Sequence, residues 1–351
     1  MKKYISLLTA LLLTVALLTG CMGTPVVVQD CTCPTEGGAT PDRPSVPVTE
    51  GSVKTGLAVI TTGATDDEAV KLDSTLVAVT VDDKGVINSC IIDSIPATVN
   101  VDATGTITSD IAAPVSTKNE LGADYGMVAW GGAIAEWDAQ VAALASYAVG
   151  KTVTELKLGA IDETGKAPAG SDLASSATIY LGGFVSAIEA AVNNAQHLGA
   201  NGSDELRLVT LNKLSSSTNA TAEEPGLIQL DADVAVVTAK DGVITSCIID
   251  SVQAKVNFDT TGTVTTDLSL EFPSKNELGE SYGMVAWGGA IAEWNVQAAS
   301  FAAYVTGKTA DEVAGIAINE ATKPADGTDL SSSVTISIGG FQALIAKALA
   351  E

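Results

Sequence analysis

Short runs rich in Val, Ile and other β-forming residues predict β-strands in the first part of the chain. Residues 76–81 and 86–92 are two such runs, and they flank Asp82-Asp83-Lys84-Gly85, whose composition is typical of a tight turn. A second, shorter pair of runs lies within residues 98–108, around the turn Ala103-Thr104-Gly105. The pattern therefore predicts two antiparallel hairpins.

Further along the chain, the spacing of apolar residues changes to the period of an α-helix. Over residues 132–148, apolar side chains recur at alternating steps of three and four, which places them on one helix face. They are Ile134, Trp137, Val141, Leu144 and Ala148. Final helices with an apolar face are expected over residues 184–192, directly after Gly182-Gly183, and over residues 341–349, directly after Gly339-Gly340.

An internal repeat organises the whole sequence. The segment that begins at Gly85 recurs at Gly242, and the offset of 157 residues holds without insertion as far as Phe184 and Phe341. A repeat of this length is a whole domain and not a solenoid unit. Two copies in one chain can also be compared with each other, which shows where the sequence has changed since duplication.

The two copies differ unevenly. Residues 118–152 and 275–309 differ at only 10 of 35 positions, and the thirteen residues 125–137 recur unchanged as 282–294. The stretch 57–84 has diverged strongly from its counterpart.

We therefore expect an α+β protein with two tandem homologous domains, each a twisted antiparallel sheet packed with helices. The first domain is expected over residues 54–194 and the second over 205–351, with a linker at 195–204. The sequence does not indicate whether the two domains touch.

The N-terminus predicts export and a lipid anchor. Lys2 and Lys3 precede an apolar run over residues 5–18, which is the pattern of a signal peptide and is short for a membrane span. Leu18-Thr19-Gly20-Cys21 resembles the lipobox of bacterial lipoproteins. We expect a signal peptide at 1–20, a lipidated Cys21 and a flexible spacer at 21–53, with the protein held at the extracellular face of the cytoplasmic membrane. An ordinary secretory signal that happens to precede a cysteine is the alternative.

Charge and cysteine content exclude several classes of function. A formal net charge of -24 argues against nucleic acid and anionic lipid as partners, because both would repel the protein. The chain has five cysteines and one histidine, and it lacks the Cys-x-x-Cys-His motif of c-type haem. The same scarcity argues against zinc and iron–sulfur sites, so no metal site is expected. A redox cofactor would therefore have to be organic.

A short motif before each final helix carries the sharpest chemical signal. It reads Asp172-Leu173-Ala174-Ser175-Ser176-Ala177-Thr178 in the first copy and Asp329-Leu330-Ser331-Ser332-Ser333-Val334-Thr335 in the second. The motif resembles the flavinylation motif of FMN-binding domains, in which a flavin transferase uses FAD to esterify a Thr hydroxyl with the FMN phosphate. A loop with an N-cap before a helix would use the same residue types, because Ser, Asp and Thr satisfy helix amides.

The resemblance implies two covalent FMN groups per chain, attached at Thr178 and Thr335. It also implies a cofactor-binding role for the residues around each threonine, which are Asp172, Ser175, Ser176 and Ala177 in the first copy and Asp329, Ser332, Ser333 and Val334 in the second. The sequence departs from the motif in two ways. Ser176 and Ser333 stand where Gly is commonest, and Val334 adds bulk beside Thr335.

A wider resemblance connects the chain to the FMN-binding lipoproteins of flavin-based extracellular electron transfer. It rests on Lys118-Asn119-Glu120-Leu121-Gly122, Tyr125-Gly126-Met127, Glu136-Trp137 with Gln140, and Gly150-Lys151-Thr152, and it covers both repeats, the lipid signal and the spacer. The resemblance implies an electron carrier more than a self-contained enzyme. The carrier would take electrons from a membrane quinol-linked source and pass them to ferric iron, free flavins or a reductase.

Two aromatic clusters could border the isoalloxazine ring of FMN, because flat rings and a thioether suit such a surface. They are Tyr125, Met127 and Trp130 in the first copy and Tyr282, Met284 and Trp287 in the second. Core packing explains these residues equally well. Two rival functions stay open: a cofactor-free cell-wall binding or adhesion lipoprotein, and a flavin-dependent reductase with its own substrate.

Overall fold

The computed structural model describes residues 46–66 and 69–350, and over these residues it confirms the α+β class. The lipobox, Cys21 and most of the expected spacer lie outside the described residues. Within the described part of the chain, no helix is long and apolar enough to cross a membrane.

Each repeat contains one three-stranded antiparallel sheet, in which the strands follow one another in sequence order. The first sheet contains β1 (Lys54–Asp66), β2 (Ala69–Val81) and β3 (Ile87–Asn100), and the second contains β4 (Glu205–Lys213), β5 (Gly226–Lys240) and β6 (Val243–Phe258). The β2–β3 hairpin confirms the predicted turn at 82–85, where the Asp82 carboxylate accepts 2.8 Å hydrogen bonds from the amides of Lys84 and Val86. The second predicted hairpin is reduced to an isolated bridge between Val101 and Ile107.

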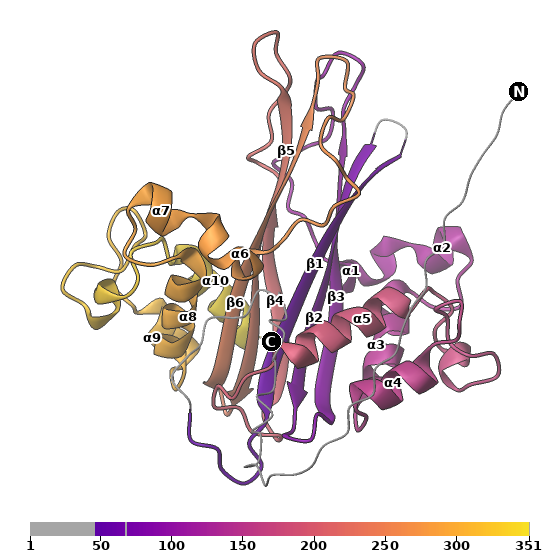
Figure 1. Ribbon diagram of the computed structural model, residues 1–351, viewed down its shortest axis with the longest axis vertical. Helices are drawn as coiled ribbons and strands as arrows, with labels where there is room; N and C mark the ends of the chain where they lie inside the picture. The colour runs from indigo at the N-terminus through magenta and orange to yellow at the C-terminus, as the bar shows by residue number, and fades with distance from the viewer. Residues whose placement is uncertain (1–45, 67–68, 351) are drawn as a thin grey trace, which may run out of the picture. The chain divides into compact units, whose positions relative to one another are not determined.

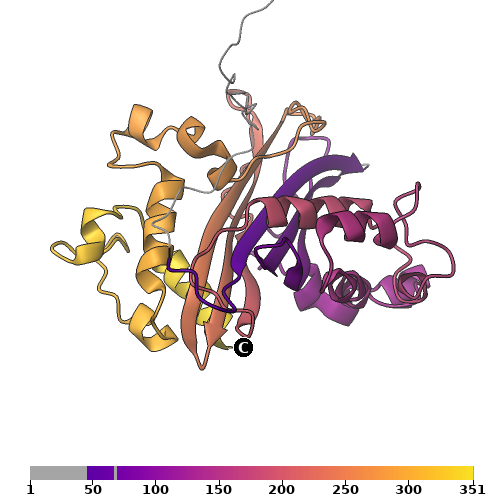
Figure 2. The same cartoon turned by 60° about the horizontal axis from the view of Figure 1, so that its bottom comes forward.

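The two sheets share one hydrophobic core. Side chains from both repeats form this inner core, among them Leu76, Ile95, Ile228 and Phe258, each fully buried. Figures 1 and 2 show the two sheets side by side at the centre, with helices on either flank. The repeats are therefore packed against each other and not merely joined in sequence.

Helices cover the outer face of each sheet. In the first repeat, α3 (Trp137–Ala148) and α5 (Gly182–Asn193) pack on it, and in the second α8 (Trp294–Val305) and α10 (Gly339–Ala350) do so. These helices and the outward-facing strand residues form a separate outer core in each repeat. The second halves of β2 and β5, residues 76–81 and 234–239, are thus buried on both faces, which explains their nearly continuous apolar sequence.

The helix predicted over 132–148 begins only at Trp137. Residues Met127–Gly131 form a separate short helix, α2, which ends at Gly132 in the left-handed conformation (φ 62°). Glu136 is in extended conformation before α3, so Ile134, expected on the buried stripe, is 56% exposed. The rest of the stripe is buried, and the second repeat has the same break before α8, with Ile291 also 56% exposed.

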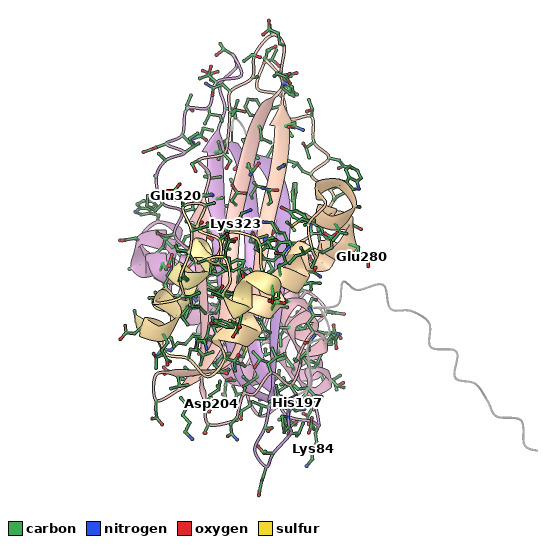
Figure 3. All side chains as sticks on the ribbon, turned by 90° about the vertical axis from the view of Figure 1, so that its left-hand side faces the viewer. Lys84, His197, Asp204, Glu280, Glu320 and Lys323 are labelled. Atoms are coloured by element: carbon green, nitrogen blue, oxygen red, sulfur yellow. The ribbon has the colours of Figure 1, made fainter. Side chains whose placement is uncertain are left out.

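Short helical segments complete each repeat. In the first repeat they are α1 (Lys118–Leu121), η1 (Gly122–Tyr125), α4 (Val153–Ala160) and η2 (Leu173–Ser175). In the second they are α6 (Lys275–Leu278), η3 (Gly279–Tyr282), α7 (Met284–Gly288), α9 (Ala310–Ala314) and η4 (Asp329–Ser332). Figure 3 views the helical layer of the second repeat from outside.

The segment 195–204 between the repeats is packed. Leu198 and Ala200 are buried, and Gln196 forms an antiparallel bridge with Thr55 of β1. The ring of His197 lies 2.8 Å from Asp83 in the β2–β3 turn, and this hydrogen bond lowers the pKa of the Asp83 carboxyl. Figure 3 shows His197 toward the same end of the molecule as Lys84 and Asp204.

The shared core predicts cooperative unfolding. Phe258 is fully buried and its ring lies against Gly226, where an added Cβ would approach it to 2.1 Å. We expect Phe258→Ala to lower the free energy of unfolding by about 3–5 kcal/mol, in one transition for both repeats. Leu158→Ala, at an 81% exposed position, should change it by less than about 0.5 kcal/mol. Guanidinium titration measures both values, and two separate transitions, only one of them shifted by Phe258→Ala, would contradict the shared core.

Candidate functional site

Residues 172–178 of the first repeat, which we call the acceptor loop after their predicted role, bury two of their side chains. Leu173 and Ala177 enter the outer core of the first repeat, while Ser175, Ser176 and Thr178 stay exposed. The Ser175 hydroxyl donates a 2.6 Å hydrogen bond to the carbonyl of Asp172, which stabilises the η2 turn. The loop thus presents the Thr178 hydroxyl at the surface with small polar neighbours.

The acceptor loop of the second repeat, residues 329–335, repeats this arrangement. Leu330 and Val334 are buried, and the Ser332 hydroxyl donates to the carbonyl of Asp329 at 2.8 Å. Thr335 is half-buried.

Neither departure from the flavinylation motif obstructs these loops. Ser176 and Ser333 have φ angles of -117° and -118°, which non-glycine residues adopt without strain. Val334 is 1% exposed within the outer core of its repeat, so its added bulk fills the core and does not cover Thr335.

A buried glutamine connects each acceptor loop to the helical layer. The Gln140 Oε1 atom accepts hydrogen bonds from the Thr178 amide at 2.8 Å and from the Thr178 hydroxyl at 3.3 Å. Its Nε2 atom donates to the carbonyl of Ala135 at 2.8 Å. Gln297 does the same in the second repeat, with Thr335 at 2.8 and 3.2 Å and Ala292 at 2.8 Å.

Ala135 follows α2, and α2 and the residue pair before it contain the predicted aromatic residues. We call residues 125–136 and 282–293 the tryptophan loops. In the first, Gly126 (φ 79°) precedes α2, and the Glu136 carboxylate accepts hydrogen bonds from the amides of Met127 and Val128 at 2.8 and 3.0 Å. This carboxylate satisfies the N-terminal amides of α2 and fixes the loop. Glu293 has the same role for α7.

The predicted aromatic residues divide into two groups. Tyr125 and Met127 are half-buried and pack against the outer core, and the Lys118 ammonium lies 5.2 Å from the centroid of the Tyr125 ring. Trp130 is 89% exposed. In the second repeat, Tyr282 and Met284 pack on the core and Trp287 is 91% exposed. Core packing therefore explains the tyrosines and methionines but not the tryptophans.

Comparison of the repeats separates packing from surface function. Three buried positions of α3 have changed in α8: Val141 to Ala298, Leu144 to Phe301 and Ala148 to Val305. The exposed residues of the tryptophan loop, including Val128, Trp130 and Ile134, have not changed. Because these large apolar side chains are exposed and identical in the two copies, the tryptophan loop is the candidate for a binding site.

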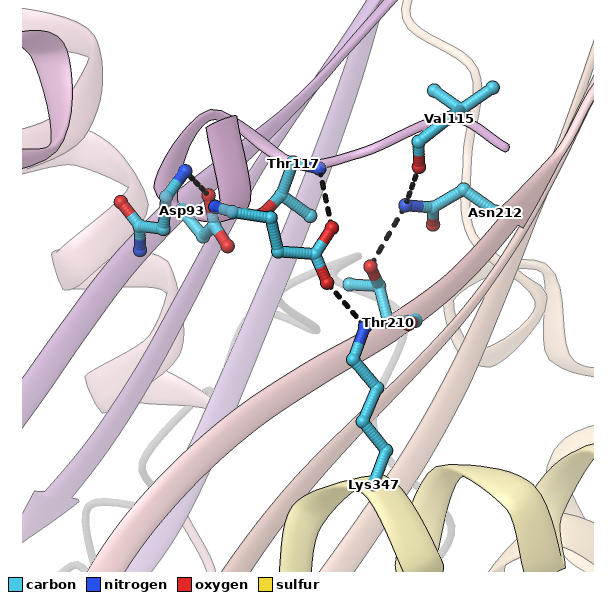
Figure 4. Close-up of polar contacts among 8 residues, drawn as sticks. Asp93, Val115, Thr117, Thr210, Asn212 and Lys347 are labelled. Carbon is cyan, nitrogen blue, oxygen red and sulfur yellow. Dashed lines mark hydrogen bonds and ion pairs between the residues drawn. The ribbon is translucent and has the colours of Figure 1, made fainter. Parts of the chain in front are cut away.

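A cavity of about 400 Å³, lined by both polar and apolar residues, lies between the repeats. Lys347 of α10 forms an ion pair with Glu120 of α1 and donates to the Thr210 carbonyl at 2.9 Å, and Asn212 donates to the Val115 carbonyl at 3.0 Å (Figure 4). These contacts hold the repeats together. The acceptor threonines and the tryptophans do not line this cavity.

A buried carboxylate attaches a short helix to each sheet. Asp93 accepts hydrogen bonds from the amides of Ser94 and Asn119 at 2.7 and 3.1 Å, and Asp250 accepts from Ser251 and Asn276 at 2.7 and 3.0 Å. Burial raises the pKa of both carboxyls, and that of Asp250 reaches about 7. Sequence reasoning missed these residues because a single Asp in a strand has no local signature.

Within the described residues, no group of three or more His, Cys, Asp or Glu side chains could hold a metal ion. The Cys90 thiol is a weak acid, because burial raises its pKa to about 12. No protein-family model, curated protein or solved structure matches the chain.

The exposed tryptophans should contribute almost nothing to stability. We expect Trp130→Ala to change the free energy of unfolding by less than about 0.5 kcal/mol, because the side chain is exposed. Trp137→Ala should lower it by about 3–5 kcal/mol, because Trp137 is 5% exposed and packs edge-on against Phe184 at 5.8 Å. Urea titration of both variants is the measurement, and a large loss for Trp130→Ala would mean that Trp130 is a packing residue.

Asp250 should make stability depend on pH. Because its pKa is raised in the folded state, the folded protein holds this proton more tightly than the unfolded chain does. Its contribution therefore falls as pH rises from about 4 through about 7. We expect Asp250→Asn to reduce this fall while keeping an oxygen that accepts the two amides. Thermal unfolding from pH 4 to 8 tests this, and parallel curves for wild type and variant would contradict it.

Proposed function

We propose that the protein is an electron-transfer flavoprotein that carries one covalent FMN on Thr178 and one on Thr335. One arrangement, present in both repeats, supports this most. A buried glutamine joins the acceptor threonine to the exposed tryptophan loop through hydrogen bonds to both. The two elements lie far apart in the sequence and are linked in both repeats.

The residues present fit such a cofactor. The threonine hydroxyl is within reach of another enzyme, the neighbouring side chains are small, and the exposed indole of Trp130 or Trp287 offers a flat surface that a planar ring system would cover. Bound FMN would supply two-electron, two-proton redox chemistry. Ser175, Ser176 and their counterparts would border the phosphate, whereas Ala177 and Val334 would support the loop from within the core.

The surroundings of the two sites suit a carrier. Figures 1 and 2 show the helical layers, and the tryptophan loops with them, on opposite sides of the paired sheets. A partner could therefore approach either site without meeting the other. We propose that the donor is a membrane quinol-linked source and that the acceptors are ferric iron, free flavins or a reductase. A flavin transferase that uses FAD would load both threonines. The lipid anchor at Cys21, at the extracellular face of the cytoplasmic membrane, would keep the carrier close to its donor.

A cofactor-free cell-wall binding or adhesion lipoprotein is the second candidate. The exposed tryptophans favour it as well, because an indole also stacks on sugar rings. The two functions differ in colour, since an adhesin purified from the native host would have no visible absorbance. A flavin-dependent reductase would differ from a carrier by saturable turnover of a bound substrate.

Intact mass tests the attachment sites. Protein purified from the native host should carry two FMN units, and Thr178→Ala and Thr335→Ala should each remove one, because each substitution deletes one hydroxyl nucleophile. Thr164→Ala, at an exposed threonine of a tight turn, is the control and should leave both units in place. An unmodified mass, in a host shown to flavinylate other proteins, would reject the flavin and leave the adhesin.

Electron transfer has its own test. Holoprotein reduced anaerobically with dithionite should be reoxidised by ferric citrate or free flavin, with two electrons released per FMN, and this is followed as recovery of flavin absorbance. Failure with ferric citrate, free flavins and a reductase partner alike would reject the carrier while leaving the flavin attachment intact.

A further inference from the structure

Gln140 and Gln297 are polar residues at helix positions that are otherwise buried and apolar. Both side chains are fully buried, and each lies on the inward face of its helix beside apolar residues such as Trp137 and Val141. Burying an amide group without hydrogen bonds is unfavourable by several kcal/mol, whereas leucine would be accommodated there without that penalty. Val141, Leu144 and Ala148 on the same helix face have changed between the repeats, whereas Gln140 and Trp137 have not.

The hydrogen bonds account for the glutamine. The single Oε1 atom of Gln140 accepts from the Thr178 amide at 2.8 Å and also lies 3.3 Å from both the Ile179 amide and the Thr178 hydroxyl. The 2.8 Å bond is a strong one and the 3.3 Å contacts are weak, so the glutamine mainly fixes the backbone of the acceptor and only loosely orients the hydroxyl.

We propose that Gln140 and Gln297 are positioning residues that hold each acceptor threonine ready for flavin transfer; this inference rests on the proposed function. In the transfer, the Thr oxygen forms a bond to the FMN phosphorus of FAD, the phosphoanhydride bond breaks, AMP leaves and the hydroxyl proton passes to solvent. The 2.8 Å bond to the Thr amide keeps the backbone of the acceptor in place, and the weaker hydroxyl contact lets the hydroxyl rotate and release its proton outward.

The same side chain also sets the distance between the acceptor and the tryptophan loop. Gln140 Nε2 donates to the Ala135 carbonyl at 2.8 Å, five residues beyond Trp130, and Gln297 Nε2 reaches Ala292 at 2.8 Å. One amide group thus connects the attachment point with the surface that the attached ring would cover.

The two repeats provide an internal control for the test. Full-length Gln140→Leu, produced with the flavin transferase and FAD, should load Thr178 at least roughly tenfold more slowly than wild type, while Thr335 loads at its normal rate. Gln297→Leu should give the reverse. Timed samples digested to peptides give the loading of each threonine by mass spectrometry.

Gln342→Val separates positioning from general destabilisation. Gln342 in α10 donates to the carbonyls of Val313 and Ile316 at 2.9 and 3.2 Å, and the equivalent residue of the first repeat is already Val185. This variant also loses two hydrogen bonds in a helical layer, so its melting temperature should fall by an amount similar to that of Gln297→Leu, but Thr335 should load normally.

Three results would be decisive. Normal loading of Thr178 in Gln140→Leu would overturn the proposal, and so would slow loading of Thr335 in Gln342→Val with a matched loss of melting temperature. Selective slow loading of the threonine next to the substituted glutamine would support it. If neither threonine of the wild type acquires flavin, the proposed function itself fails, and that result is distinct because it does not depend on the glutamine variants.

Discussion

The packing of the two sheets against each other is the constraint from which the rest of the structure follows. Side chains from β2 and β5 meet in one inner core, with Leu76 and Ile228 fully buried. A sheet whose inner face is covered by another sheet has only its outer face left for helices. The helices of each repeat therefore pack outward, and the loops that they carry lie on opposite sides of the molecule (Figure 1). The charged contact of Lys347 with Glu120 adds to this apolar interface.

Duplication makes the chain informative about function. Inside each repeat the buried face of the main helix has been repacked, as in the change from Leu144 to Phe301, and the fold has accommodated the new volumes. The exposed tryptophan loop has kept every residue, although solvent tolerates most substitutions. The unchanged, exposed apolar residues of this loop support the proposal that it binds a ligand. The buried glutamine belongs to the unchanged set because its partners are backbone groups of the two loops.

The sequence predicted what is encoded locally. The Asp82–Gly85 turn and the two final helices are correct, because turn chemistry and helical periodicity act over a few residues. The helix at 132–148 was predicted too long, since apolar spacing continues through Ile134 although Gly132 and the extended Glu136 interrupt the backbone. Strand β1 and the shared core were not foreseen, because pairing with distant strands leaves no period in the sequence. The contact of Gln140 with Thr178 was hidden for the same reason, as the two residues are 38 positions apart.

The proposed electron transfer requires a flavin that is bound covalently to the chain. The most direct measurement is flavin absorbance after denaturation, in which protein from the native host is unfolded in guanidinium chloride and separated from small molecules by gel filtration. We expect the yellow colour to elute with the unfolded polypeptide, because an ester bond survives unfolding. A colourless polypeptide, from cells whose other flavinylated proteins keep their colour in the same procedure, would contradict the central claim.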